Sequence, residues 1–183
     1  MIVQRLSIPE VILITPKVYG DARGYFYESF NAKRFYELTA SDVPFVQDNH
    51  SSSVLGTLRG LHYQIAPHGQ GKLVRVVEGA VFDVVVDLRR SSPSFGQWTS
   101  AILSAENQQQ LWIPQGFAHG FLTLTDTAQF LYKTTDYYAP QAERCIAWND
   151  PQIGIDWPSL SVAPVLSAKD QTGMTLSAAE CFK

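Results

Sequence analysis

A short polar segment inside an apolar pattern is the first place where this sequence could do chemistry. The segment Leu58–Gln64 carries an imidazole at His62 and a guanidinium at Arg59, and Lys72 and Arg75 follow after a short loop. An imidazole can take up and return protons near neutral pH, and lysine and arginine attract anions. Polar groups are costly to bury without partners, so their density among strand-forming residues indicates a site for acid–base chemistry or hydrogen bonding.

The spacing within this segment leaves two interpretations open. A strictly alternating strand places Gly60, His62 and Gln64 on one face and turns Arg59 away from the imidazole. Gly60 could relax this alternation, since glycine permits a β-bulge that changes the direction of a neighbouring side chain. His62 is then either a hydrogen-bonded core histidine beside a surface arginine, or part of a site. Residues further along the chain favour the site.

Length and composition favour one globular domain over residues 1–183. The chain is 45% hydrophobic and 12% aromatic, which is enough for one sizeable core. A formal net charge of −3 argues against a nucleic-acid or anionic-membrane partner. The cysteines Cys145 and Cys181 lack a paired spacing, and such a core requires no disulfide. The amino terminus has no signal-peptide layout and no long apolar run, so we expect a cytoplasmic protein.

Short β-rich runs separated by turn residues make up most of the chain. We predict strands at Val11–Ile14, Tyr25–Phe30, Phe45–His50, Leu73–Val77, Val81–Leu88, Thr99–Leu103, Leu111–Ile113, Gly120–Leu124 and Gln129–Thr135. Apolar residues alternate in 82–88, which predicts a half-buried antiparallel strand there. Many strands at this spacing indicate an all-β fold, a cupin-type jelly-roll sandwich or barrel with a few short peripheral helices.

Two helices are expected outside these strands. Asn31 is placed to cap a helix over Ala32–Leu38. Ser177–Glu180 has the pattern of a capping box that opens a last helical turn. Both helices are short, in keeping with a β fold.

The segment Pro114–His119 matches the second cupin motif, in which a Pro-x-Gly turn presents a histidine into the mouth of a small β-barrel. Metal cupins add a His-x-His pair and a glutamate in the first motif. Here the first motif is His62-Tyr63-Gln64, and Ala66–Gly69 occupies the region expected to hold the glutamate. We therefore expect no catalytic metal. His62 and His119 are then free for acid–base catalysis or hydrogen bonding.

Further segments, taken in their order and spacing, resemble the dTDP-4-dehydrorhamnose 3,5-epimerases, which are cofactor-independent enzymes of the cupin fold. The similarity covers nearly the whole chain. It rests on Gly20–Glu28, Val46–Asn49, Leu58–Gln64, Gly71–Arg75, Ser92–Gly96, Leu111–Phe121, Tyr132–Lys133, Trp148–Asp150 and Leu166–Asp170. Tyr138 departs from the phenylalanine of related sequences, a change that preserves aromatic stacking.

The resemblance implies inversion of C3 and C5 in dTDP-4-dehydro-6-deoxy-D-glucose, a step toward dTDP-L-rhamnose and surface polysaccharide. The C4 ketone acidifies the C–H bonds at C3 and C5, because loss of either proton gives an enolate. Inversion needs a base, an acid on the opposite face and a group that holds the oxyanion, without cofactor or metal. By resemblance, His62 is the base oriented by Asp170, Lys72 stabilises the enolate, Tyr132 is the acid and His119 neighbours the C4 oxygen.

The same resemblance assigns other polar groups to the substrate, with arginines suited to its pyrophosphate and Tyr138 to stacking on the thymine. The implied substrate-binding residues are Arg23, Phe26, Glu28, Gln47, Asp48, Asn49, Arg59, Lys72, His119, Tyr138, Glu143 and Lys169. Family members are homodimers in which an amino-terminal strand joins the neighbour's sheet. Glu28 or Phe26 would then serve the partner's site.

The sequence leaves three alternatives. A mono-epimerase or ketoisomerase would use the same scaffold, although Tyr132 together with His62 and Asp170 favours double inversion. A nucleotide-sugar-binding jelly roll without catalysis would need neither the histidine–aspartate pair nor a buried lysine. A metal cupin, such as an oxygenase or a sugar-phosphate isomerase, would contain bound metal after purification.

Overall fold

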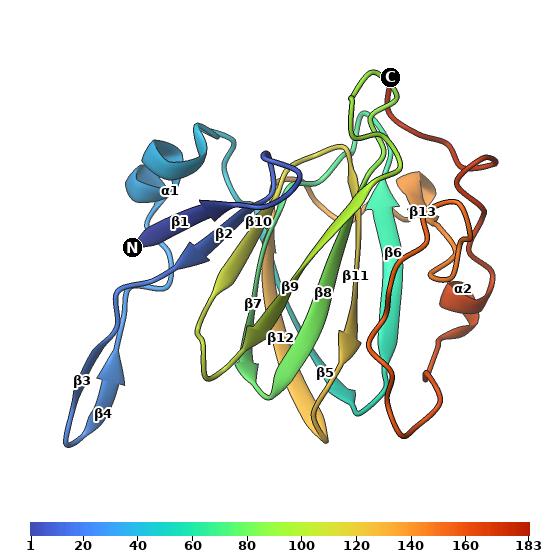
Figure 1. Cartoon of the computed structure of the whole chain (residues 1–183). Helices are drawn as coiled ribbons and strands as arrows, with labels where there is room; N and C mark the ends of the chain where they lie inside the picture. The colour runs from blue at the N-terminus through green and yellow to red at the C-terminus, as the bar shows by residue number, and fades with distance from the viewer.

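The computed structural model describes all residues 1–183, and strands dominate it (Figure 1). The strands are β1 (Ile2–Arg5), β2 (Ile12–Thr15), β3 (Tyr19–Asp21), β4 (Gly24–Phe26), β5 (Gln47–Val54), β6 (Leu58–Gln64), β7 (Lys72–Glu78), β8 (Ala80–Asp87), β9 (Trp98–Ser104), β10 (Gln110–Ile113), β11 (Phe117–Thr123), β12 (Thr127–Thr134) and β13 (Glu143–Cys145). The helices are α1 (Ala32–Thr39), the 3-10 turn η1 (Pro140–Ala142) and α2 (Ala168–Gln171).

Two antiparallel sheets form the body of the protein. The order of the six-stranded sheet is β1-β2-β10-β7-β12-β5, and that of the five-stranded sheet is β13-β6-β11-β8-β9. Buried side chains from both sheets, including Val74 and Phe130 from one and Val85 and Phe121 from the other, make one core cluster. The predicted all-β, cupin-type jelly roll with a few short helices is confirmed.

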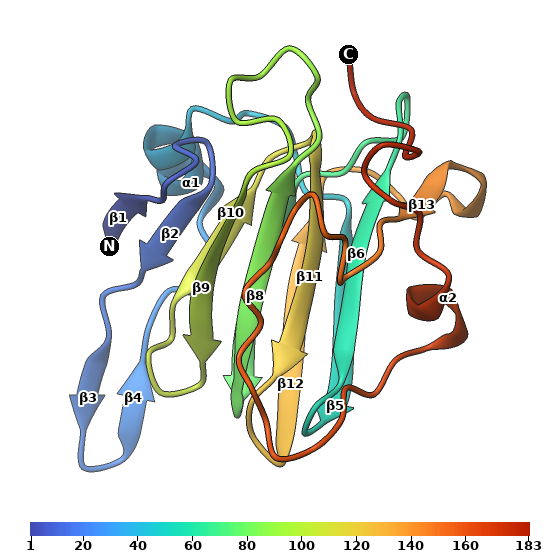
Figure 2. The same cartoon turned by 45° about the vertical axis from the view of Figure 1, so that its right-hand side comes forward.

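Strand β8 differs from the sequence prediction because both of its faces are buried. Val81 and Val85 belong to the core between the sheets, whereas Val84 and Val86 pack on the other side against residues such as Leu176. Figure 2 shows the carboxyl-terminal part of the chain, orange to red, crossing the outer face of the five-stranded sheet. The prediction of a half-buried strand is wrong, since this distant segment covers the second face.

The region after the first hairpin also departs from the prediction. A strand over Tyr25–Phe30 is wrong beyond Phe26, where β4 ends, because β4 pairs only with the three-residue strand β3. Phe30 instead packs against Phe35 of α1. Asn31 caps this helix as predicted, and its side chain accepts a hydrogen bond from the backbone of Arg34.

The capping box lies at α2 and not at the predicted position. The Ser167 hydroxyl accepts from the backbone N–H of Asp170, and the Asp170 carboxylate accepts from the backbone N–H of Ser167. Ser177–Glu180 forms a turn, so the predicted last helical turn is wrong. The chain extends again beyond it, where Phe182 bridges to Arg89. The box at α2 matters for function because it fixes Asp170 beside β6.

The β3–β4 hairpin extends away from the two sheets (Figures 1 and 2). Its aromatic side chains Tyr25 and Phe26 are 65% and 71% exposed. Exposed aromatic groups of this size commonly mark an interaction surface. None of the helices is long and apolar enough to cross a membrane.

Candidate active site

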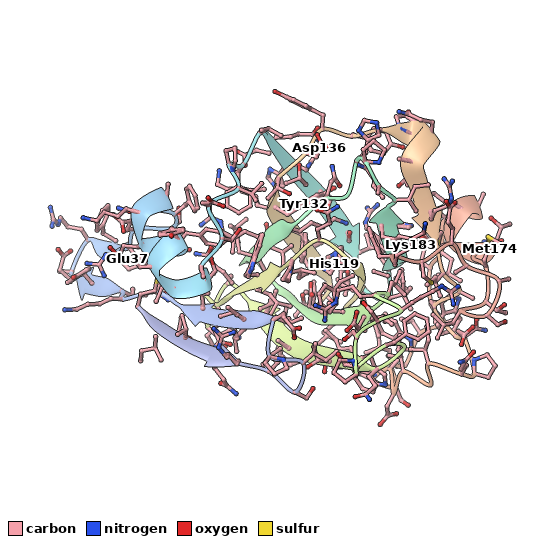
Figure 3. The ribbon with its side chains drawn as sticks, turned by 90° about the horizontal axis from the view of Figure 1, so that it is seen from above. Glu37, His119, Tyr132, Asp136, Met174 and Lys183 are labelled. Carbon is pink, nitrogen blue, oxygen red and sulfur yellow. The ribbon has the colours of Figure 1, made fainter.

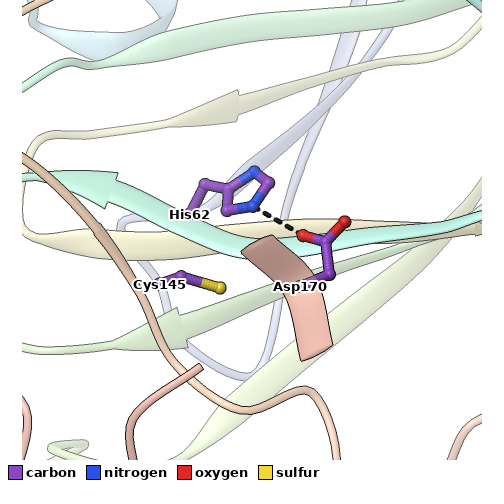
Figure 4. Close-up of side chains that lie close together, drawn as sticks. All are labelled: His62, Cys145 and Asp170. Carbon is purple, nitrogen blue, oxygen red and sulfur yellow. Dashed lines mark ion pairs between the residues drawn. The ribbon is translucent and has the colours of Figure 1, made fainter. Parts of the chain in front are cut away.

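A histidine–aspartate pair lies where α2 meets β6. The Nε2 atom of His62 lies 2.7 Å from a carboxylate oxygen of Asp170 (Figure 4). The same carboxylate accepts hydrogen bonds from Gly60 N–H and from Ser167. Burial alone would raise the pKa of Asp170, but hydrogen bonds from His62, Ser167 and Gly60 hold that pKa well below its usual range. An ionised carboxylate beside Nε2 favours the tautomer that carries its proton there, which leaves a lone pair on Nδ1, as a general base requires.

Gly60 interrupts the alternation of β6, as the sequence allowed. The register between β6 and β11 shifts at this position, and the φ angle of Gly60 is 132°, a conformation that favours glycine. A Cβ atom here would lie 2.6 Å from the Cα of Gly120. Arg59 remains exposed but reaches the six-stranded sheet, where its Nε donates to Ser53 Oγ at 3.1 Å. The bulge therefore directs Arg59 toward the other sheet.

His119 forms a second histidine–carboxylate pair, with a residue that sequence reasoning missed. His119 lies opposite His62 in the pairing of β11 with β6. Its Nε2 lies 3.0 and 2.9 Å from the two carboxylate oxygens of Asp83 on β8. Burial raises the pKa of Asp83, and His119 and Lys72 offset part of this rise. Asp83 is 0% exposed, so His119 is its hydrogen-bond partner in the interior and Asp83 fixes the orientation of the imidazole.

We expect Asp83→Asn to lower kcat while the fold persists. An amide cannot accept hydrogen bonds through both of its terminal atoms, so His119 loses its orientation. A hydrogen bond to a charged group contributes about 1.5–3 kcal/mol, which corresponds to a rate loss of roughly 10- to 150-fold. Steady-state kinetics and circular dichroism would check this prediction. Asp87→Asn is the matched control, because buried Asp87 on the same strand binds Arg89, Ser92 and Ser94 instead of a histidine; an equal loss of kcat in that variant would contradict the prediction.

Lys72 contributes a half-buried lysine side chain at the start of β7. Burial lowers the pKa of Lys72 to about 8, while the carboxylates of Glu143 and Asp83 partly oppose this shift. A cation that has lost its water attracts a nearby oxyanion more strongly than a hydrated one does. Lys72 is therefore suited to stabilise negative charge that develops on a substrate oxygen.

Tyr132 lies on β12 of the opposite sheet. Its ring packs against the core cluster between the sheets, and Figure 3 shows Tyr132 and His119 in the central part of the protein, away from Glu37 on α1. Burial raises the pKa of Tyr132, although Arg59 counteracts part of the rise. The phenol therefore keeps its proton at neutral pH, as an acid that donates to a carbanion must.

Five of the expected substrate-binding residues form a group joined by hydrogen bonds and an ion pair at the end of β6. The Tyr138 hydroxyl donates to Glu143 at 2.7 Å, and Lys169 makes an ion pair with Glu143. Gln47 accepts from the backbone N–H of Tyr138 at 3.0 Å and donates to Asn49 at 2.9 Å. Burial alone would raise the pKa of Glu143, but the hydrogen bonds from Lys169 and Tyr138 lower it overall. The carboxylate of Glu143 also acts electrostatically on Lys72, whose pKa it raises in part.

The structure does not bring every expected residue to this cluster. Asp48 lies on the outer face of β5, where it makes an ion pair of 2.9 Å with Lys133. Arg23 lies on the β3–β4 hairpin, with its side chain 90% exposed and paired with Asp21. Phe26 ends the same hairpin, and Glu28 follows it and accepts a hydrogen bond from Asn31. Within one chain these groups remain apart from His62.

The fold and the site together define the class of protein: a cupin-type jelly-roll isomerase with acid–base groups between its sheets. The family model described as dTDP-4-dehydrorhamnose 3,5-epimerase matches residues 5–178. The chain belongs to this family.

Individual relatives agree with the family match. The dTDP-4-dehydrorhamnose 3,5-epimerase of Pseudomonas aeruginosa is 61% identical over 178 residues, covering 97% of each chain. A crystal structure of dTDP-6-deoxy-D-glucose-3,5-epimerase from Legionella pneumophila in complex with dTDP-4-keto-L-rhamnose has a TM-score of 0.94 at 53% identity, covering 97% of this chain and 94% of that one. ChmJ, a 3'-monoepimerase from Streptomyces bikiniensis in complex with dTDP-quinovose, has a TM-score of 0.89 at 37% identity, covering 95% of this chain and 87% of that one.

Proposed function

We propose that this protein is a dTDP-4-dehydrorhamnose 3,5-epimerase that inverts C3 and C5 of dTDP-4-dehydro-6-deoxy-D-glucose to give dTDP-4-dehydro-L-rhamnose. The observation that carries the proposal is the His62–Asp170 pair, together with a half-buried lysine at Lys72 and a protonated tyrosine at Tyr132. The identity of 61% to a curated 3,5-epimerase supports the choice of substrate. The reaction requires no cofactor beyond these side chains.

The residues have distinct roles in the proposed mechanism. Nδ1 of His62 takes the proton from a carbon next to the C4 ketone, and Asp170 holds Nε2–H so that the lone pair stays on Nδ1. Lys72 and His119 stabilise the enolate oxygen. Tyr132 then donates a proton to the opposite face of the same carbon, which inverts the centre. His62 then releases its proton to solvent and Tyr132 takes one up, after which the same steps invert the second carbon.

NMR in D₂O tests the proposed function. Purified, metal-stripped protein is incubated with dTDP-4-dehydro-6-deoxy-D-glucose, and a downstream reductase traps the L-sugar. Deuterium at both C3 and C5 is the expected result. Exchange at C3 alone would make the protein a mono-epimerase or ketoisomerase. This is the second candidate function, because the 3'-monoepimerase ChmJ has the same fold. No exchange at either carbon would reduce it to a nucleotide-sugar-binding protein.

Tyr132→Phe is expected to separate proton exchange from inversion. Removal of the hydroxyl leaves His62 able to abstract and return a proton on one face, so deuterium still enters the substrate in part. Inversion falls by about 10²- to 10⁴-fold, because the opposite face has no acid. NMR would follow both quantities in one sample. Unchanged inversion would remove Tyr132 as the acid.

The other expected substrate contacts belong to the same proposal. Arg59 binds the pyrophosphate, Tyr138 stacks on the thymine ring, and Gln47, Asn49, Glu143 and Lys169 contact the rest of the substrate. The hydrogen bonds and the ion pair that join Gln47, Tyr138, Glu143 and Lys169 support their assignment, while Arg59 lies near the other end of β6. Asp48 remains the weakest member, since it lies on the outer face of β5.

A homodimer would complete this site. The exposed aromatic hairpin supports a partner contact, because 71% exposure of Phe26 is costly in an isolated chain. Arg23, Phe26 and Glu28 would then reach the substrate held by the neighbouring subunit. We further propose that residues 1–183 act as one domain, in the cytoplasm, and that the product supplies dTDP-L-rhamnose for polysaccharide synthesis.

A further inference from the structure

Cys145 lies beside the histidine–aspartate pair and has no role in the proposed reaction. It occupies β13, where it is the direct antiparallel partner of His62 on β6. One ligand atom from each of His62, Cys145 and Asp170 lies within 4.8 Å of the others (Figure 4). The thiol is free and half-buried. The three side chains come from three separate elements, so the fold alone brings these nitrogen, sulfur and oxygen donors together.

We propose that His62, Cys145 and Asp170 form an inhibitory binding site for a thiophilic divalent cation, represented by Zn²⁺. Zinc takes histidine nitrogen at about 2.0 Å, cysteine sulfur at about 2.3 Å and carboxylate oxygen at about 2.0–2.2 Å, in tetrahedral sites that need only three protein ligands. Such bond lengths separate the donor atoms by roughly 3.3–3.8 Å in a tetrahedral site. The Nε2–carboxylate distance of 2.7 Å must therefore open slightly, and the sulfur must approach.

Two features prepare these groups for a cation. Asp170 is held by hydrogen bonds from Ser167 and Gly60, so one carboxylate ligand is oriented before the metal arrives. The pairing of β13 with β6 fixes the backbone of Cys145 against that of His62. The sulfur distinguishes this site from an ordinary catalytic dyad, because soft thiolate favours zinc over magnesium or calcium.

Binding would stop catalysis through the tautomer of His62, a consequence that rests on the proposed role of this residue as the base. The cation takes the position of the proton between Nε2 and Asp170. A neutral imidazole keeps one proton, which moves to Nδ1 when the metal bonds to Nε2. The thiol releases its proton to solvent and coordinates as thiolate. Nδ1 then has no lone pair with which to accept a proton from the substrate.

Titration of metal-stripped protein with Zn²⁺ tests the inference. We expect reversible loss of epimerisation that EDTA restores, while Mg²⁺ at the same concentration has no effect. Cys145→Ser should keep its basal activity and require roughly 10- to 100-fold more Zn²⁺ for the same inhibition. Cys181→Ser is the matched control, since it removes the other free thiol and leaves the site intact. Equal zinc sensitivity of the Cys145→Ser variant and the unaltered protein would overturn the proposal.

A binding measurement without turnover separates this inference from the proposed function. Cd²⁺ replaces Zn²⁺ as the probe, because its bond to thiolate produces a charge-transfer band in the near ultraviolet. The band should appear in the unaltered protein and in Cys181→Ser, and be lost in Cys145→Ser and Cys145→Ala. Its absence from the unaltered protein would overturn the metal site. A band without inhibition would support the metal site and count against His62 as the base.

Discussion

His62→Ala is expected to abolish epimerisation while the protein keeps its fold and binds nucleotide. The imidazole is the group whose Nδ1 takes the substrate proton, and general-base catalysis typically contributes about 10²- to 10⁴-fold in rate. Alanine also removes the partner of the Asp170 carboxylate, which keeps its hydrogen bonds from Gly60 and Ser167. Stability should therefore change little compared with turnover. Deuterium exchange at C3 and C5 measures the chemical step, and titration with dTDP measures binding.

A surface histidine provides the control for this variant. His50 on β5 is exposed, and its interaction is with Gln129 at 2.7 Å. His50→Ala should keep full exchange and full dTDP affinity. Loss of dTDP binding by His62→Ala in proportion to its loss of exchange would count against a role as base, because it would indicate collapse of the site instead.

The sequence predicts the sheets well because their signals are local. Alternating apolar residues and intervening turn residues correspond closely to strands such as β9 and β12. The same local signal cannot reveal what covers a strand. The second buried face of β8 depends on residues such as Ile153 and Leu176, which follow it by more than sixty positions in the chain. Periodicity therefore misses which distant segments of the chain pack over each face of a sheet.

The same limit applies to the site: residues in a local motif can be predicted, whereas their partners from distant parts of the chain cannot. The motif around His62 stands out within one strand, whereas its partner Asp170 was expected only from the family resemblance. Asp83 was missed, since its strand was taken as half-buried and a carboxylate on the solvent side needs no partner. An aspartate in the middle of a strongly apolar run was the available signal, because burial of such a charge requires a cation or imidazole nearby. His119 in the second cupin motif was that imidazole.

Lys72→Met is expected to reduce kcat by about 10²- to 10³-fold, the loss typical of removing one group that stabilises an oxyanion. Methionine matches the length and apolar stem of lysine, so packing beside β10 and β12 persists. Unfolding should require no less denaturant than in the unaltered protein, because burial of the ammonium group opposes its ionisation in the folded state. Lys33→Met, on the exposed surface of α1, is the matched control and should retain full activity.

The pH profile gives an independent test of the same lysine. The pKa of Lys72 is lowered to about 8, primarily by burial, so the ammonium group exists below that pH and is lost as pH rises through it. The value of kcat/KM should therefore fall on the alkaline side, since this ratio reports ionisations of the free enzyme. Lys72→Arg keeps its charge throughout this range, so whatever activity it retains should lack the alkaline decline. An unchanged decline in Lys72→Arg would assign the titration to another group and leave Lys72 without the proposed role.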